Sequence, residues 1–345
     1  MIPMQLEAVL SHAVALIPIL AFLGALRLID SYKLVPGKRI LVALGVGGAA
    51  AALCYAINSP AFHLFQAYGI DYARFGAPFI EELVKGWYWI SLIATARVAF
   101  MVDAGICSFA VGAGFSVVEN FFYLHEQGGQ GIAVSTLRGL GTAVMHGGVA
   151  AIAAMVTIFL SERKGWRGLR LFAPGLLIAM IIHSFFNQGL LSPVASTVVM
   201  LVSMPLLMAA VFLWSESLLR NWLGDKLDSD IELLNMIATG ELHKTRSGTY
   251  LQSLQDVFPP AIRGDMLCML QLTIELSVRA KGDMLMREAG IEIPPDPEID
   301  GQFQELAYLE NSIGRTGMLA VAPLLSQTPR DLWEMRRLAQ GRSRS

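Results

Sequence analysis

The chain has 345 residues, of which 54% are hydrophobic and only 16% are charged. Because a soluble globular protein carries about 25% charged residues, this composition indicates an integral membrane protein. The formal net charge of -2 gives no electrostatic reason to expect a nucleic acid as partner. Two of the three cysteines, Cys54 and Cys107, fall within apolar segments, so a disulfide framework is not expected.

Seven apolar stretches are each long enough to cross a bilayer, which takes about 20 mostly apolar residues. They cover residues 6–28, 40–58, 77–98, 104–124, 133–160, 171–190 and 194–214. We therefore expect an all-α fold, a polytopic bundle of about seven transmembrane helices.

The Lys and Arg residues near the ends of these stretches predict the orientation of the chain. With the N-terminus outside, the predicted inner loops carry eleven basic residues, and the outer loops carry only Arg74 and Arg138. The inner residues are Arg27, Lys33, Lys38, Arg39, Arg97, Arg163, Lys164, Arg167, Arg170, Arg220 and Lys226. Because cytoplasmic loops are enriched in Lys and Arg, the N-terminus is expected on the extracytoplasmic side.

The sequence changes character after the seventh stretch. Residues 215–345 place apolar residues at helical spacing with charges between them, and the segment IPPDPEID interrupts this pattern. We expect two domains, a transmembrane domain over residues 1–214 and a small helical cytosolic domain over residues 215–345.

Several polar side chains lie inside the apolar stretches, although a charged residue at the centre of a transmembrane helix costs about 2.5–3.5 kcal/mol. They are Glu81, Glu82 and Lys85 in EELVK, Glu119 in VVENF, His146 in VMHGG, and His183 and Asn187 in HSFFN. Residues this costly are expected to have a functional or structural reason for their position.

Helical geometry predicts that these residues share a face and a depth. At about 100° per residue, Glu81, Glu82 and Lys85 lie within a single arc of about 100°. With the orientation above, Glu81, Glu119 and His183 lie roughly 8–11 Å below the outer surface at about 1.5 Å per residue, and His146 lies a little deeper. The four helices can therefore contribute to one site that opens outward.

A structural explanation exists for each residue taken alone. Glu81 or Glu82 with Lys85 could be a buried ion pair that fixes helix packing. Glu119, His146 and the His183–Asn187 pair could hydrogen-bond neighbouring helices. Packing alone does not require the same depth in four helices, so the shared depth favours a common site.

Two hydrolytic chemistries fit these residue types. A glutamate can act as the general base that activates water while His and Asn polarise the scissile carbonyl and Lys tunes the carboxylate. Alternatively, Glu119, His146 and His183 can supply a ligand set for catalytic Zn²⁺ with an open fourth position, and Glu81 or Glu82 then activates the water. The sequence contains no HExxH motif, and a metal-free mechanism stays open.

The motifs EELVK, GFSVVENFFY, His146 and HSFFN, taken together, resemble the PrsW family of intramembrane proteases, within the superfamily of CAAX prenyl endopeptidases and bacteriocin-processing enzymes. The CAAX pattern is EExxxR, FxxxH and HxxxN. Here Lys85 comes one residue earlier than the arginine, and Glu119 replaces the histidine four residues after Phe115. With these two replacements the pattern is similar to that of the PrsW family.

The resemblance implies an intramembrane endopeptidase, described in that family as a metalloprotease. It implies Glu81 as the water-activating base, Glu82 as its support, and His183 with Asn187 as oxyanion stabilisers. It also implies a membrane-anchored protein substrate, such as an anti-sigma factor, cut near the extracytoplasmic face.

Two other classes of protein are compatible with the same residues. A proton- or cation-coupled transporter could use the buried Glu and His side chains as a relay; the absence of a visible internal repeat disfavours it. A membrane scaffold could recruit partners through its cytosolic helices, but this leaves the polar cluster unexplained.

Overall fold

The computed structural model describes residues 23–28, 30–126, 132–164, 168–291, 293–294, 296–325 and 328–341. Within these ranges every regular element is a helix, which confirms the predicted all-α class. The chain separates into two compact units, Met1–Glu216 and Ser217–Ser345. The roles assigned to the two predicted domains stay predictions.

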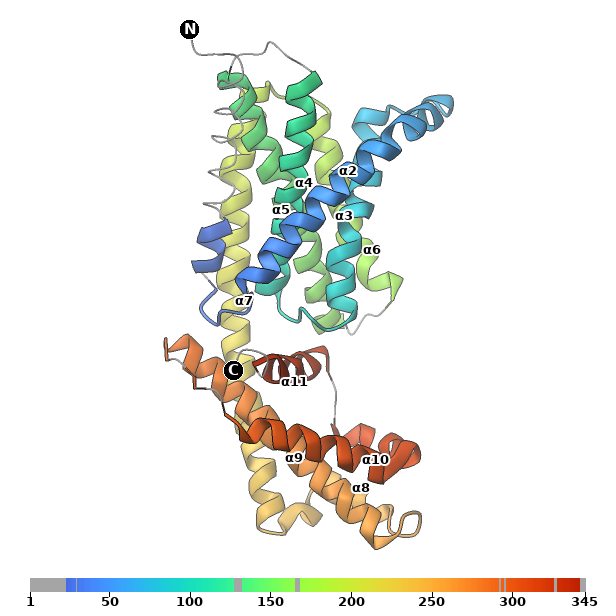
Figure 1. Ribbon diagram of the computed structural model, residues 1–345, viewed down its shortest axis with the longest axis vertical. Coiled ribbons are helices and arrows are strands. Elements are labelled where there is room, and N and C mark those ends of the chain that lie inside the picture. The colour runs from blue at the N-terminus through green and yellow to red at the C-terminus, as the bar shows by residue number, and fades with distance from the viewer. Residues whose placement is uncertain are drawn as a thin grey trace. The chain divides into compact units, whose positions relative to one another are not determined.

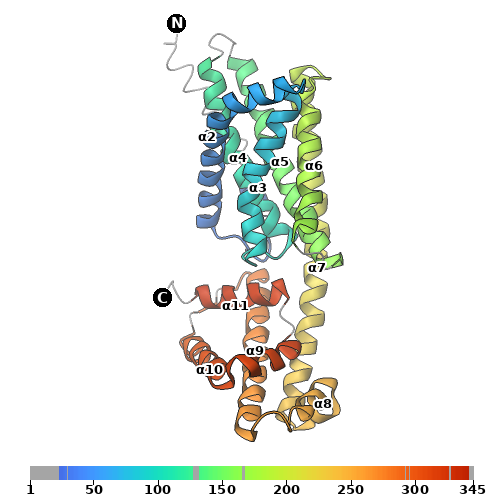
Figure 2. The ribbon, with the colours of Figure 1, turned by 90° about the vertical axis from the view of Figure 1, so that its right-hand side faces the viewer.

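Six long helices begin in the first unit and build it (Figures 1 and 2). They are α2 (Gly37–Ala67), α3 (Ala77–Ala94), α4 (Met101–Glu126), α5 (Ile132–Lys164), α6 (Leu169–Asn187) and α7 (Pro193–Ala238). A short π-helix, η1 (Tyr72–Gly76), precedes α3. Helix α4 packs against α2, α3 and α5, and α3 also contacts α2, α5 and α6. Helices α4 and α5 are the inner elements of the bundle, since most of their apolar residues are buried, and α3 packs against both.

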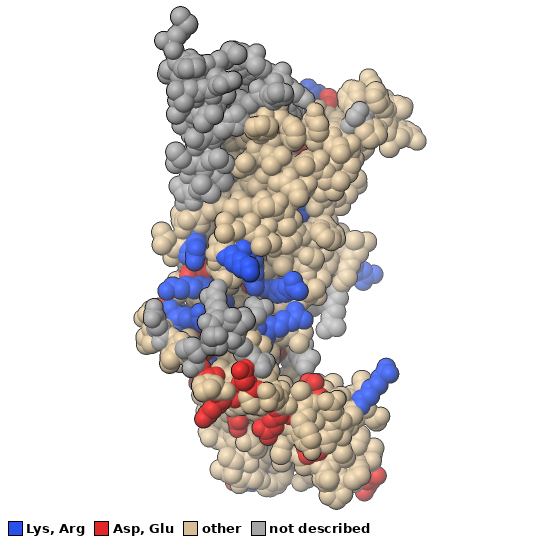
Figure 3. Space-filling model, in the orientation of Figure 1, with Lys and Arg blue, Asp and Glu red and all other residues tan. Residues whose placement is uncertain are grey.

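Five of these helices are long and apolar enough to cross a membrane, namely α2, α4, α5, α6 and α7. Helix α3 occupies the predicted 77–98 stretch, with three charged side chains on its buried face and the apolar side chains Phe79, Leu83 and Trp87 on its exposed face. Most of the first predicted stretch, 6–28, lies outside the described residues. In Figure 3 the face over α2 is almost free of charged side chains, as a lipid-facing surface should be.

Helix α2 runs nine residues past the predicted end at residue 58, since no charge or helix-stopping glycine interrupts it. The helix ends at Ala67, and Gly69, two residues later, has a φ of 69° in the left-handed region that favours glycine. The amide N–H of Ile70 donates to the carbonyl of Phe65 there, and that of Gly69 donates to Gln66. Together these bonds close the helix with a Schellman-type turn.

Two glycines bring backbones into direct contact inside the bundle. A Cβ added at Gly47 in α2 would lie 1.9 Å from the carbonyl oxygen of Val111 in α4. A Cβ added at Gly112 in α4 would lie 2.2 Å from the carbonyl oxygen of His146 in α5. Such crossings by small residues are typical of membrane helices, and the second one places His146.

The second unit is a separate helical assembly. It comprises the end of α7, η2 (Glu241–Lys244), α8 (Arg246–Ser253), α9 (Pro260–Glu288), α10 (Glu298–Leu325) and α11 (Pro329–Gly341). The predicted break at IPPDPEID is the connection between α9 and α10. Gly314 bends α10 with a φ of 67° and a ψ of 177°, and residues such as Met266, Leu276 and Val321 form the apolar core.

A buried lysine joins three helices of this unit. The Nζ of Lys281 in α9 lies 2.9 Å from Asp230 Oδ2 in α7 and 2.9 Å from Glu334 Oε2 in α11. It also donates to Ser277 Oγ at 2.5 Å. Burial raises the pKa of Glu334 to about 7, against the opposing effect of the Lys281 ammonium.

Candidate active site

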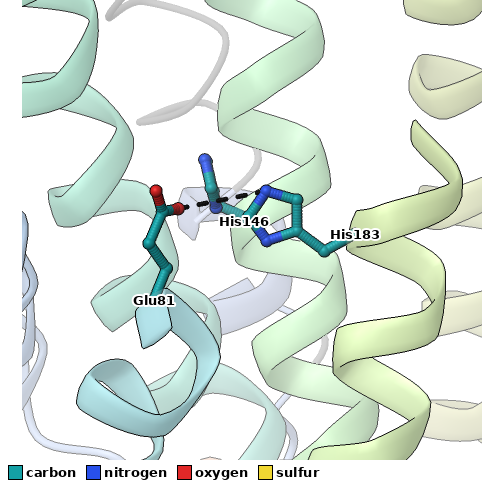
Figure 4. Close-up of side chains that lie close together, drawn as sticks. All are labelled: Glu81, His146 and His183. Carbon is teal, nitrogen blue, oxygen red and sulfur yellow. Dashed lines mark ion pairs between the residues drawn. The ribbon is translucent and has the colours of Figure 1, made fainter. Parts of the chain in front are cut away.

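Four helices bring the polar residues of the apolar stretches together at one cavity. Glu81, Glu82 and Lys85 come from α3, Glu119 from α4, His146 from α5 and His183 from α6. The side chains from α3, α5 and α6 are buried. Figure 4 shows the Glu81 carboxylate and the two imidazoles directed toward one another. The predicted convergence of separate helices is therefore present in the fold.

Glu81, His146 and His183 each offer one metal-ligand atom, and these three atoms lie within 4.8 Å of one another. The Oε2 atom of Glu81 is buried and accepts no hydrogen bond from the described residues. Its distance to Nε2 of His183 is 3.9 Å, too long for a hydrogen bond. An unpaired buried carboxylate oxygen is costly, so this atom is suited to a bound cation.

Glu82 supports His183 from the side opposite Glu81. Nδ1 of His183 lies 2.7 Å from Oε1 of Glu82, so this nitrogen carries the proton and donates it to the carboxylate. The Nε2 atom is then left with a lone pair. Metal-binding histidines are commonly held in this way by a carboxylate on the other ring nitrogen.

Lys85 links Glu82 to the second histidine. Its Nζ donates to Glu82 Oε1 at 2.5 Å and lies 2.7 Å from Nδ1 of His146. Nε2 of His146 lies 2.9 Å from Oε2 of Glu119. With an ammonium at Nδ1, the neutral imidazole carries its proton on Nε2 and donates it to Glu119.

The cavity beside these residues has a volume of about 510 Å³. Its polar wall includes Glu81, Glu119, His146, His183 and Asn187. Its apolar and aromatic wall includes Ala51, Cys54, Tyr55, Phe115, Phe122 and Phe186. Glu82 and Lys85 do not line it, so they lie behind the residues that do.

The structure thus brings six of the seven predicted residues together. Five of them form one hydrogen-bonded chain, Glu119, His146, Lys85, Glu82 and His183, and Glu81 lies beside it. The seventh, Asn187, lines the cavity, but its Nδ2 donates to the carbonyl of Ala73 in η1 at 2.9 Å. Its oxyanion role stays a prediction. The carboxylate that joins the two histidines within ligand distance is Glu81, whereas the sequence favoured Glu119 for that position.

The cavity wall includes further polar residues that were not predicted, among them Asn58 at the end of the apolar part of α2 and Tyr72 in η1. Asn58 looked like the boundary of a membrane span, and Tyr72 lies in a connection without a helical pattern. Asn58 interrupts an apolar run at the predicted outer surface, and this interruption is the one sequence signal that could have identified it.

Comparison with known proteins decides between the classes left open by the sequence. The family model described as PrsW family intramembrane metalloprotease matches residues 36–214. The chain belongs to the PrsW family. No curated protein and no solved structure gave a significant match. The match covers all the site residues, and it makes the protein an intramembrane protease that acts on a membrane protein in the lipid bilayer.

PrsW membership also bears on the metal. The family is described as metalloproteases, and the donor set of two imidazoles and one carboxylate is the type that catalytic zinc uses. The unpartnered Oε2 of Glu81 and the carboxylate-supported His183 fit such an ion. The residues of the site are thus compatible with the metal that the family description implies.

Proposed function

We propose that the protein is a zinc-dependent intramembrane endopeptidase that cuts a single-span membrane protein near the extracytoplasmic face. The observation that carries this proposal is the convergence of Glu81, His146 and His183 beside a cavity large enough for a peptide segment. The excess of Lys and Arg in the alternate loops supports an N-terminus outside and a cytoplasmic second unit. A membrane-bound regulator resembling an anti-sigma factor is the substrate type that PrsW membership favours.

In this proposal Glu81, His146 and His183 hold the zinc ion. When bound, zinc polarises the scissile carbonyl and makes water a stronger nucleophile at neutral pH. Of the two partners of His146, Glu119 lines the cavity and Lys85 does not. Nε2 of His146 would therefore be the atom that holds the ion, in place of its hydrogen bond to Glu119.

Glu119 then acts as the general base of the reaction. It is partly exposed to the cavity, where it can accept a proton from the attacking water and later deliver it to the leaving amine. Glu82 orients His183, and Lys85 orients His146 while neutralising Glu82. These two residues position the ligands and do not touch the substrate.

The proposal is tested by comparing membranes from cells that produce the wild-type chain or the Glu81→Gln variant. Mass spectrometry of protein termini should find new ends in the wild-type membranes, located just outside the outer ends of single transmembrane helices. They should be missing with Glu81→Gln. Identical termini in both samples would refute the proposed activity, and termini confined to cytosolic segments would refute the proposed orientation.

Metal analysis of the purified full-length protein tests the cofactor. About one zinc per chain is expected for the wild type and much less for His183→Ala. A full complement of zinc in His183→Ala, or activity unaffected by a chelator, would show that the assigned ligands are wrong.

A further inference from the structure

The segment between α2 and α3 is an ordered π-helical turn at the edge of the cavity. Asp71 caps η1 by accepting the N–H of Arg74 at 3.2 Å. Helix α6 holds the turn from the other side, since Ser184 Oγ donates to the Arg74 carbonyl at 2.6 Å and Asn187 donates to that of Ala73. Isolated π-helical turns are rare and occur frequently at functional sites.

Tyr72, the first residue of η1, is fixed by contacts on its ring and on its hydroxyl. The ring packs edge-on against Phe62 and Phe65 of α2, with centroids 5.9 and 5.7 Å away. A Cβ at Gly76 would lie 2.5 Å from Cδ2 of Tyr72, so glycine is needed there to leave room for the ring. The hydroxyl donates to Oδ1 of Asn58 at 2.6 Å.

Tyr72 and Asn58 both line the same cavity as Glu81 and the two histidines. Tyr72 also lies close enough to Glu81 for the charge of that carboxylate to affect it. Burial, followed by the charge of Glu81 and the neighbouring Cys54, raises the pKa of the Tyr72 hydroxyl to about 12. The phenol therefore keeps its proton at neutral pH and can only serve as a neutral donor.

Amide hydrolysis needs such a donor. When the oxygen of water bonds to the scissile carbon, the carbonyl π electrons move onto oxygen and create an oxyanion, which then collapses as the C–N bond breaks. Preorganised donors toward this oxygen are among the largest contributions to catalysis. The two histidines donate to carboxylates, His183 to Glu82 and His146 to Glu119. Tyr72 donates only to the neutral amide oxygen of Asn58, so its hydrogen bond is the easier one to exchange.

We infer that Tyr72 is a further catalytic residue, whose hydroxyl leaves Asn58 and donates a hydrogen bond to the oxyanion during peptide hydrolysis. Asn58 is a neutral acceptor, so the exchange trades a neutral hydrogen bond for a stronger charge-assisted one. The contacts of η1 with α6 hold the ring at the cavity edge while the hydroxyl changes partner. This inference rests on the proposed function, because it requires a peptide carbonyl at the Glu81–His146–His183 cluster.

The test is steady-state cleavage of a quenched-fluorescent transmembrane peptide in proteoliposomes, built on a bond identified by the analysis of termini above. Tyr72→Phe keeps the ring and removes only the hydroxyl. We expect kcat to fall on the order of 10²-fold, with KM and thermal stability little changed. Tyr68→Phe, one turn away and strongly exposed, is the matched control and should behave as wild type.

A second variant, Asn58→Ala, removes the hydrogen bond that the Tyr72 hydroxyl makes in the free protein and keeps the hydroxyl itself. Asn58→Ala keeps the phenol, so it should retain most of kcat. Equal losses of kcat in Asn58→Ala and Tyr72→Phe would overturn the inference, and so would an unchanged kcat in Tyr72→Phe. Glu81→Gln tests the proposed protease activity separately from the role of Tyr72. If Glu81→Gln stays active, the proposed function fails. If Glu81→Gln is inactive and Tyr72→Phe is fully active, only the role of Tyr72 is wrong.

Discussion

Two buried lysines, Lys85 in the first unit and Lys281 in the second, both contact carboxylates but lie in different surroundings. Lys85 in α3 contacts Glu82 and a histidine, and Glu81 next to it keeps an unpartnered oxygen toward a cavity. Lys281 in α9 is held by Asp230, Glu334 and Ser277, which tie α7, α9 and α11 together. Buried charge alone therefore does not mark an active site in this protein. Oε1 of Glu334 is also buried without a hydrogen bond from the described residues, so the feature that favours the first cluster as the candidate site is the cavity that Glu81 lines.

The largest expected effect is on the chemistry of the first cluster. Glu81→Gln replaces the free carboxylate oxygen by an amide and should lower cleavage by 10³-fold or more, on the order of 4 kcal/mol of transition-state stabilisation, with little change in thermal stability. The measurement is peptide cleavage in proteoliposomes beside thermal unfolding. Glu310→Gln on the exposed face of α10 is the control. A Glu81→Gln protein that unfolds much more easily would make this cluster structural, like the second one.

The second cluster should respond in the opposite way. Lys281→Met leaves Asp230 and Glu334 without their buried cation and should destabilise the second unit by about 3–5 kcal/mol. Chemical denaturation of the full-length protein in detergent measures this loss. Lys244→Met breaks an exposed pair with Glu241 and should cost at most about 1 kcal/mol. Equal effects of the two substitutions would contradict the structural role of Lys281.

A smaller effect is expected behind the ligands of the first cluster. Glu82→Gln weakens the support of His183 and should reduce zinc affinity or activity about 10- to 100-fold. Zinc competition with a chelator, carried out on the purified protein, gives the affinity. If Glu82→Gln leaves the zinc affinity unchanged and lowers the thermal stability, Glu82 serves helix packing and does not position His183.

The smallest effect is a pH dependence of the second cluster. Glu334 has a model-peptide pKa of 4.5 and a pKa of about 7 in the folded chain, so the folded state holds the proton more tightly. Its stabilising contribution is full below the unfolded pKa and is lost as the pH rises through 7. Between about pH 6 and pH 8 the free energy of unfolding should fall by about 1 kcal/mol. This change should disappear in Glu334→Gln, and its persistence there would assign it to other groups.

The apolar stretches predicted most of the helices because hydrophobic length is a local property. The extensions of α2 to Ala67 and of α7 to Ala238 were missed for a related reason: a helix needs no apolar sequence once it leaves the bilayer. Charged residues begin near residue 215. They correctly indicate the end of the apolar span, but the same helix, α7, continues to Ala238.

The candidate site was predictable only in part. The cost of burying charge identified its residues, and their common depth indicated that they meet. Sequence could not decide which of the adjacent carboxylates Glu81 and Glu82 lines the cavity, since about 100° of helix rotation separates them and packing sets that rotation. Tyr72 could not be predicted, because it lies in a short connection whose sequence has no periodic pattern.

The backbone contact between Gly112 and the carbonyl of His146 has a consequence for how such proteases diversify. A side chain at Gly112 would force the two helices apart, so His146 has little freedom to change its position. The aromatic wall of the cavity, formed by Tyr55, Phe122 and Phe186, is made of exchangeable side chains. Relatives that select other target sequences should therefore differ at this wall and keep the same glycine.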